Sequence, residues 1–191
     1  MRVSKRSLFF RTACVCARVV MDDVTRIGNR RSVISMSPDD IAQTLRVFLA
    51  SVGTLGLATT DEHGLPYAAN VNFAADDAMN LYFVSHPDSA HARHSERRSQ
   101  VAGTMYAPFT RPEDIRGVQF RGRCDPVGAG DFGRVWALYV RKFPYAVQFE
   151  DRIRTERFYR ITPGWIRMID NTIRFGYKWE TDWPVRRDVQ A

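Results

Sequence analysis

Three short strand-forming segments follow one another between residues 54 and 84, separated only by tight turns. Thr54 to Thr60 and Tyr67 to Phe73 are rich in residues that favour strands. Between them, Asp61 to Gly64 is typical of a hairpin turn, because Gly64 can adopt positive φ. A second turn at 76–80 leads to Leu81 to Val84. Since turns this short cannot hold a crossover connection, the three strands are predicted to be antiparallel.

The rest of the chain adds strands and a few helices. Ser37 and Pro38 are typical of a helix start, followed by an apolar face at helical spacing, and Gly53 is predicted to end that helix. Two inserted helices are predicted, a polar one over 91–100 and one over 131–142 that Asp131 would cap. Further strands are predicted over 101–106, 115–125, 158–163 and 165–169, with a last short one over 172–177. This pattern without a βαβ rhythm predicts a mainly β protein of the α+β class, a small closed or partly closed antiparallel barrel.

Composition excludes several classes of protein. No run of about 18 apolar residues occurs, so no spanning helix is expected and no membrane partner is predicted. Three cysteines without a C-x-x-C pair fit neither a disulfide scaffold nor a zinc ribbon nor a thioredoxin site. Cys124 is a lone thiol without an adjacent basic motif, so we expect it to be inert. The sequence contains neither a G-x-S-x-G nucleophile elbow nor a Gly-rich phosphate loop with lysine.

The net charge of +7 is concentrated at the N-terminus. Residues 1–35 hold eight of the 28 Lys and Arg residues and two of the 21 acids, which leaves 20 bases against 19 acids in the remainder. Because the body is close to neutral, it lacks the broad basic surface of a nucleic-acid-binding protein, and we expect no nucleic-acid partner.

Three segments are predicted along the chain. Residues 1–35 form a basic N-terminal extension, disordered or lying upstream of a true start at Met36 or Met21, with an organelle-targeting peptide as the alternative. Residues 36–182 form the folded domain, and residues 183–191 form a C-terminal tail. No clean apolar core of a secretory signal is recognised, so a cytoplasmic location is expected.

The densest polar segment runs from Ser85 to Arg98 and holds His86, His91 and His94. As an anion site, it would place hydroxyls, imidazoles and guanidiniums where a strand ends and a helix begins, beside free backbone N–H groups. As an ordinary solvated helix face, it would bind nothing. A metal site of His91, His94 and Asp88 fits less well, because the spacing matches no strong zinc signature.

A second candidate is the strand segment Ala68 to Asn72. Small residues beside two amide side chains would let a flat ring lie along the backbone, with amides bonding to its edge. Gln119, a polar residue among apolar neighbours, could play a similar part. For both, the alternative is a strand whose polar side chains simply face solvent.

Three stretches resemble the FMN-binding split-barrel superfamily, which includes the pyridoxamine 5′-phosphate oxidases. They are the hairpin Gly56 to Asn70, the segment Ser85 to Thr104, and Arg116 to Gly122 together with Phe158 to Ile166. The string Gly117 to Gly122 and the run Asp170 to Lys178 are most similar to the YhbP-like bacterial proteins. The likeness covers about residues 38–180.

The resemblance implies a six-stranded antiparallel split β-barrel with one N-terminal and two inserted helices. It also implies a homodimer that holds FMN at the subunit interface. The flavin ring would lie against Ala69, Asn70 and Val71, with Gln119 approaching from a neighbouring strand and His86 close by. The flavin phosphate would lie at Ser85, Ser89 and His91, with Arg93 as an additional candidate. This mapping agrees with the interpretation of the loop as an anion site.

The sequence departs from the pattern of the pyridoxamine 5′-phosphate oxidases at its C-terminal end. The oxidases grip their substrate phosphate with a histidine-containing C-terminal segment, whereas Ile173 to Arg187 contains no histidine. We therefore expect an FMN-binding oxidoreductase whose substrate is unknown, with pyridoxamine phosphate oxidation disfavoured and no catalytic residue assigned. The alternative is a non-catalytic flavin- or haem-binding protein, in which His86, His91 or His94 would be axial ligands.

Overall fold

The computed structural model describes residues 36–184, so the extension predicted at 1–35 and most of the predicted tail lie outside the described residues. The helices are α1 (Pro38–Ser51), α2 (Ala90–Arg97), α3 (Phe132–Lys142) and α4 (Glu150–Arg154), with short 3-10 helices at Pro112–Asp114, Ala129–Asp131 and Pro144–Phe149. The strands are β1 (Thr54–Thr60), β2 (Pro66–Ala75), β3 (Leu81–Ser85), β4 (Gln100–Tyr106), β5 (Arg116–Pro126), β6 (Arg157–Asp170) and β7 (Lys178–Asp182).

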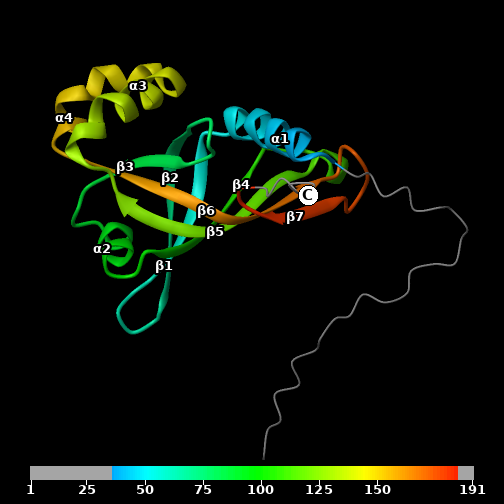
Figure 1. Cartoon of the computed structure of the whole chain (residues 1–191), viewed down its shortest axis with the longest axis horizontal. Coiled ribbons are helices and arrows are strands. Elements are labelled where there is room, and N and C mark those ends of the chain that lie inside the picture. Colours follow the sequence, from blue (N-terminus) through cyan, green and yellow to red (C-terminus); the bar gives the residue numbers. More distant parts are fainter. Residues whose placement is uncertain (1–35, 185–191) are drawn as a thin grey trace, which may run out of the picture. The chain divides into compact units, whose positions relative to one another are not determined.

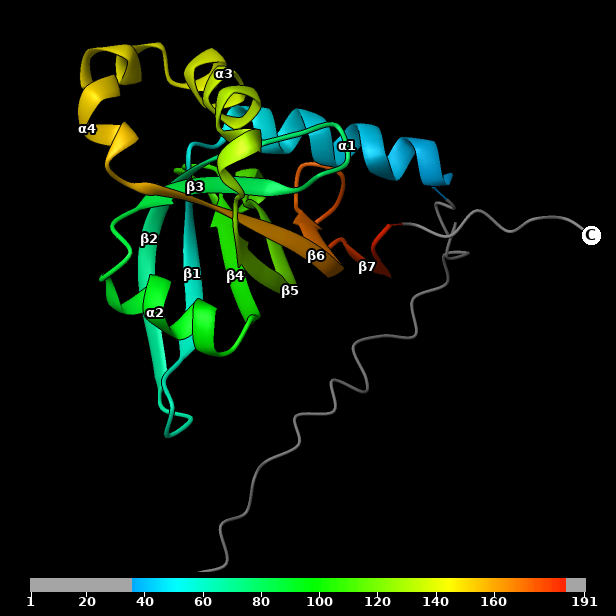
Figure 2. The same cartoon turned by 60° about the vertical axis from the view of Figure 1, so that its left-hand side comes forward.

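The strands form one antiparallel sheet that closes on itself. Their order is β3-β2-β1-β4-β5-β6-β7, and β3 also pairs with β6. Six strands therefore make a closed barrel, and β7 lies outside it as an extra strand on β6 (Figures 1 and 2). The prediction of a six-stranded split barrel of the α+β class is confirmed.

Helix α1 begins where the sequence predicts. Ser37 Oγ accepts a hydrogen bond from the Asp40 amide at 3.2 Å, and the Asp40 carboxylate accepts one from the Ser37 amide at 3.2 Å. This reciprocal pair satisfies backbone donors that a helix start otherwise leaves open. The apolar face of α1 contributes Leu45 and Phe48 to the barrel core. The helix ends at Ser51, two residues before the predicted Gly53.

Two apolar clusters hold the fold together. The larger one fills the barrel interior with inward-facing residues such as Leu57, Phe83 and Phe120. The smaller one packs α3 onto the outside of β2, β3 and β6, through residues that include Val135, Tyr139 and Phe158. Cys124 lies in the barrel core, where burial raises the pKa of its thiol to about 12, in agreement with an inert thiol.

The prediction of two closing strands at 158–163 and 165–169 is wrong. A single strand, β6, runs through Pro163 and Gly164 because β5 pairs with it along nearly its whole length. The pairing shifts register between Arg121 and Gly122, and the backbones come so close there that a Cβ on Gly122 would lie 2.3 Å from the Thr162 carbonyl oxygen. The bulge absorbs the irregularity that the sequence of β6 indicates as a break.

The last strand predicted over 172–177 is also wrong, since this segment is the turn between β6 and β7. Buried Asp170 accepts hydrogen bonds from Arg116 Nε at 3.0 Å and from Thr172 Oγ1 at 2.5 Å. Asn171 accepts one from the Gly176 amide at 2.9 Å, and Gly176 has φ of +73°. The run from Asp170 to Lys178 therefore encodes a turn whose conformation needs its polar residues and its glycine.

Two further differences concern the insertion between β5 and β6. Asp131 stands at the N-cap of α3, but its carboxylate makes no capping bond and instead pairs with Arg134 at 3.3 Å. The short helix α4 has no counterpart in the sequence-based prediction, because its five residues are too few to show a helical period.

Within residues 36–184, no helix has both the length and the apolar character needed to cross a bilayer.

Candidate functional site

Three side chains of the loop between β3 and α2 meet at one point. Ser85 ends β3, Ser89 occupies the N-cap of α2, and His91 lies in the first turn of that helix. Ser85 Oγ lies 2.8 Å from His91 Nε2 and 3.0 Å from Ser89 Oγ. Ser89 Oγ lies 3.3 Å from the same imidazole nitrogen. The structure thus brings together three of the residues predicted from the sequence, in a group that we call the hydroxyl–imidazole cluster.

The cluster leaves the start of α2 without a side-chain cap. Ser89 makes no capping hydrogen bond, although serine commonly does so at this position. Arg93, on the same turn of α2, reaches back to the Asp88 carbonyl oxygen in the same loop. Hydroxyls, an imidazole and a guanidinium therefore surround a helix start that retains backbone donors, which is the chemistry that binds phosphate.

The electrostatic state of His91 follows from its surroundings. The ring is half-buried, with its centroid 6.0 Å from that of Phe83. Burial, and secondarily the neighbouring His94, lowers the pKa of His91 below the usual value for histidine. In the free protein the imidazole is therefore mostly neutral at pH 7, and it gains charge only in more acidic solution or beside a bound anion.

The other two histidines of the segment do not join the cluster. His86 is exposed, and its Nδ1 accepts a hydrogen bond from the Asp88 amide at 3.1 Å. His94 Nδ1 lies 3.2 Å from Thr59 Oγ1, and its ring packs edge-on against Tyr67. Within the described residues, no three His, Cys, Asp or Glu side chains lie close enough together to hold a metal ion.

The residues predicted to contact a flat ring divide between two faces of the sheet. Asn70 on β2 and Gln119 on β5 point to the outer face, where both are exposed. Val71 is 8% exposed and points into the barrel, and Ala69 faces the same way. A ring on the outer face could meet the side chains of Asn70 and Gln119 but only the backbone of Ala69 and Val71.

The outer face between Asn70 and Gln119 is a shallow hollow floored by small residues. Cross-strand pairing aligns Asn70 with Gly56, Gly56 with Thr104, and Thr104 with Gln119. The neighbouring row consists of Ala68, Ala58, Ala102, Arg121 and Trp165. A hollow of about 410 Å³ covers the part from Ala68 to Gln119, and Asn70 lines a second hollow that shares Gly56 and Thr104 with it. We call this surface the small-residue face.

Sequence reasoning missed most of the small-residue face. Its glycines and alanines come from three strands, β1, β2 and β4, each of which contributes one or two that are unremarkable in their own segment. The available signal was the alternation of small outward residues with large inward ones, as in Gly56 and Ala58 against Leu55 and Leu57. Only the strand register turns such local patterns into one surface.

A closed six-stranded barrel with a polar cluster at the start of an inserted helix defines a split-barrel protein. Residues 41–170 match the family model described as Pyridoxamine 5'-phosphate oxidase. The chain therefore belongs to the pyridoxamine 5′-phosphate oxidase family.

Comparisons with curated proteins and solved structures agree. A UPF0306 protein from Klebsiella pneumoniae is 31% identical over 119 residues, which cover 61% of this chain and 78% of the relative. The UPF0306 protein YhbP of Escherichia coli O157:H7 is 29% identical over 118 residues, covering 61% and 77%.

Among solved structures, a haem-binding protein from Mycobacterium smegmatis superposes with a TM-score of 0.63 at 17% identity, over 78% of this chain and 60% of its own length. HutZ, the haem storage protein of Vibrio cholerae, gives a TM-score of 0.56 at 19% identity, over 63% and 88%. At these identities the two structures support the fold alone.

Proposed function

We propose that this protein binds FMN non-covalently and acts as an FMN-dependent oxidoreductase on a small substrate of unknown identity. The observation that carries the proposal is the convergence of Ser85, Ser89 and His91 at the start of α2. A phosphate monoester accepts hydrogen bonds from hydroxyl, imidazole and backbone N–H donors, and the helix dipole adds to its attraction.

The chain's residues fit the flavin in two parts. The hydroxyl–imidazole cluster and Arg93 would hold the phosphate, and the small-residue face would hold the ring. Asn70 and Gln119 are the amide side chains of that face, and each can donate to or accept from the edge of the ring. Flavin would supply the redox chemistry, and the protein would bind it, orient it and exclude water from it.

We propose that the flavin lies between two copies of the chain. Helix α2 packs on the inward side of β1, where His94 contacts the buried Thr59. It therefore does not cover the small-residue face, which is on the outward side of β1 and is open in a single copy. A ring lying on so shallow a surface needs a second wall, and a second copy of the chain would supply it. Leu65 and Tyr106, exposed by 62% and 67%, are apolar residues of the kind that such an interface would cover.

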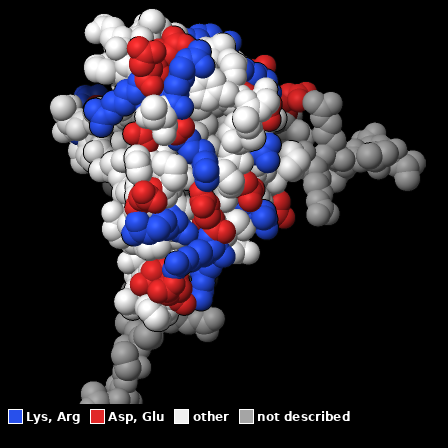
Figure 3. Space-filling view, turned by 90° about the vertical axis from the view of Figure 1, so that its left-hand side faces the viewer, with Lys and Arg blue, Asp and Glu red and all other residues white. Residues whose placement is uncertain are grey.

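The surface charge favours a small-molecule ligand over a nucleic acid. On the face seen in Figure 3, basic and acidic side chains alternate. Arg97 pairs with Glu62, Arg154 with Glu150, and Arg157 with Glu96, so each of these bases is neutralised by a neighbouring acid. No strong field of one sign is left there to attract a phosphate backbone.

The phosphate site is tested by comparing FMN with riboflavin, which has the same ring and lacks the phosphate. We expect Ser89→Ala and His91→Gln to weaken FMN binding by about 10-fold or more, because each removes a hydrogen bond to a charged group. Riboflavin binding should change little. Titration of flavin fluorescence against each variant measures both constants.

Ser99→Ala, in the loop between α2 and β4, is the matched control and should bind FMN as the original protein does. Equal loss of FMN and riboflavin affinity in Ser89→Ala would show that the flavin phosphate does not bind at this cluster. Failure of the original protein to bind FMN would overturn the proposed function. Reduction of bound FMN by NADH or NADPH then distinguishes an enzyme from a carrier.

Haem binding is the second candidate, favoured by one observation. The His86 imidazole is 61% exposed and uses only Nδ1 within the described residues, so its Nε2 is available as an axial ligand. Two solved structures that share the fold are a haem-binding protein and a haem storage protein. A Soret band after addition of hemin, lost in His86→Ala and retained in His63→Ala, would support haem over FMN.

A further inference from the structure

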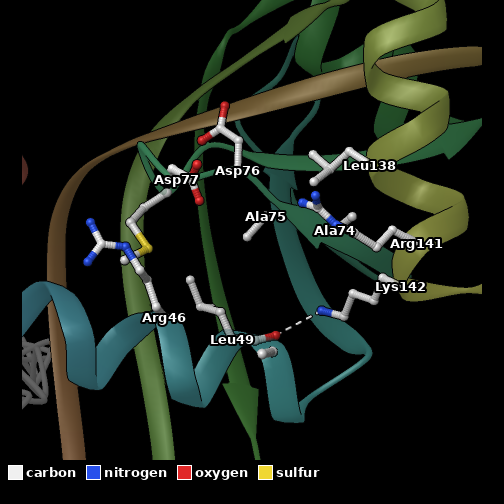
Figure 4. Close-up of a pocket in the computed structure, with 11 residues that line it drawn as sticks. Arg46, Leu49, Ala74, Ala75, Asp76, Asp77, Leu138, Arg141 and Lys142 are labelled. Carbon is white, nitrogen blue, oxygen red and sulfur yellow. Dashed lines mark hydrogen bonds between the residues drawn. The ribbon is translucent and has the colours of Figure 1, made fainter.

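A second cavity lies on another part of the molecule, between α1, α3 and the turn that joins β2 to β3. Its volume is about 400 Å³ (Figure 4). Leu49, Met79 and Leu138 contribute apolar wall, and Arg46, Arg141 and Lys142 contribute basic groups. None of its lining residues belongs to the hydroxyl–imidazole cluster or to the small-residue face.

Lys142 brings an ammonium group into this cavity with little to neutralise it. Its Nζ donates a hydrogen bond to the Leu49 carbonyl oxygen at 2.8 Å and lies 3.9 Å from the centre of the Phe73 ring. An ammonium has three donors, and within residues 36–184 only the Leu49 oxygen accepts a hydrogen bond from Nζ. Burial lowers the pKa of Lys142 to about 8, as expected for a cation without a paired anion.

The acids of the cavity do not balance its bases. Asp76 accepts hydrogen bonds from the Asn80 amide and side chain and from the Tyr82 hydroxyl, so its carboxylate is already engaged. Within the described residues, Arg46 and Arg141 form neither an ion pair nor a side-chain hydrogen bond. With Asp77 as the second acid, three bases face two acids, which leaves one net positive charge.

We propose that this cavity binds a small organic monoanion, a carboxylate carried on a short apolar chain. The carboxylate would accept hydrogen bonds from Lys142 and from a guanidinium at the rim, while the chain would lie along Leu49, Met79 and Leu138. A single negative charge balances the cavity, whereas a phosphate dianion would exceed its net charge. The cavity volume is at the lower end of the range of small-molecule sites.

Occupancy is linked to the protonation of Lys142. A carboxylate beside Nζ favours the ammonium form, so binding raises the pKa of Lys142 above 8. The bound protein therefore holds more protons than the free protein at pH 8 and above. The affinity for the carboxylate is therefore greatest below pH 8, and it falls as pH rises through the pKa that Lys142 has in the free protein.

Nuclear magnetic resonance of lysine Cε carbons tests the proposal directly, because the chain has only three lysines, Lys5, Lys142 and Lys178. Variants Lys5→Arg and Lys178→Arg assign the signals. Hexanoate is the probe, and hexanol is the neutral control of equal chain length. We expect the Lys142 signal to titrate near pH 8 in the free protein and at higher pH with saturating hexanoate, while hexanol leaves its pKa unchanged.

The guanidiniums at the rim give a variant that leaves Lys142 in place. The double variant Arg46→Gln with Arg141→Gln should weaken hexanoate binding by about tenfold or more. Arg152→Gln, on exposed α4, is the matched control and should leave the affinity unchanged. Absence of a saturable shift with hexanoate, an equal shift with hexanol, or full affinity in the double variant would each overturn the proposal. None of these results depends on whether FMN binds.

Discussion

Ser89 stands at a position where a serine is expected on two separate grounds. It occupies the N-cap of α2, a position at which serine commonly caps a helix, yet its hydroxyl lies beside Ser85 and His91. A helix cap and the proposed phosphate site would both use a serine at this position. The sequence left both interpretations open, because hydroxyl direction depends on the rotamer and the neighbouring chain.

The protonation of His91 gives the proposed FMN site a pH dependence. A bound phosphate favours the imidazolium, so the pKa of His91 is higher in the complex than in the free protein, where burial lowers it. FMN affinity should therefore fall as pH rises from the lower pKa through the higher one. Because a charge-assisted hydrogen bond is stronger than a neutral one, we expect a change of about tenfold, measured by FMN titration between pH 5 and 8.

The phosphate of FMN titrates in the same range, so the measurement needs a reference. His91→Gln keeps the ligand's own ionisation and removes that of the imidazole. The ratio of the two affinities, original protein over variant, should decline with rising pH. A constant ratio across the range would show that His91 does not sense the phosphate charge.

At the scale of elements, the start of α1 is fixed by the reciprocal hydrogen bonds of Ser37 and Asp40. Ser37→Ala removes the side-chain acceptor for the Asp40 amide, so we expect the free energy of unfolding to drop by about 1 kcal/mol. Urea denaturation followed by circular dichroism measures this change. Gln43→Ala, on the exposed side of the same helix, should change stability by less than about 0.5 kcal/mol; an equal loss in both variants would contradict the cap's role.

The bulge between β5 and β6 depends on the absence of a side chain at Gly122. A methyl group there would lie 2.3 Å from the Thr162 oxygen and 2.9 Å from Pro163 Cα, both backbone atoms that cannot rotate away. We expect Gly122→Ala to destabilise the protein by about 2 kcal/mol or more, measured by denaturant unfolding. Gly128→Ala, where nothing lies within 4 Å of an added Cβ, is the control and should be close to neutral. Similar stability of the two variants would show that the strands can separate locally at little cost.

For the whole molecule, the proposed dimer buries the small-residue face. Ala58 is exposed there and pairs with Ala68 on one side and Ala102 on the other. Ala58→Arg should convert the dimer to a monomer and release FMN, because a charged side chain would occupy the interface. Sedimentation equilibrium measures the mass, and Ala137→Arg on the exposed side of α3 should remain dimeric. A monomeric original protein would refute the dimer and the placement of the ring within it.

Most of the barrel could be predicted from the sequence, because its signals are local. Tight turns fix antiparallel neighbours, and alternating residues identify the inward faces of β1, β4 and β5. The predictions that failed concern segments whose conformation depends on contacts with residues far away in the chain. β6 stays paired with β5 on both sides of Gly164 because Gly164 is an extra residue that bulges out of the pairing, and α4 packs Ile153 against the apolar cluster that contains Val135 and Tyr139 of α3.

The sequence by itself determined the order of the strands along the chain, the start of α1 and the segment that contains Ser85, Ser89 and His91. These features depend on turn chemistry, helix capping and side-chain type within a few residues. Only the tertiary structure decided that Ser85, Ser89 and His91 meet while His86 and His94 turn away, and that small residues of three strands form one surface. It also decided that Lys142 lines one cavity with Arg46 and Arg141, which have no acidic partner within residues 36–184. Contacts of this kind join residues far apart in the chain, and their geometry follows from strand register and packing, which no local pattern encodes.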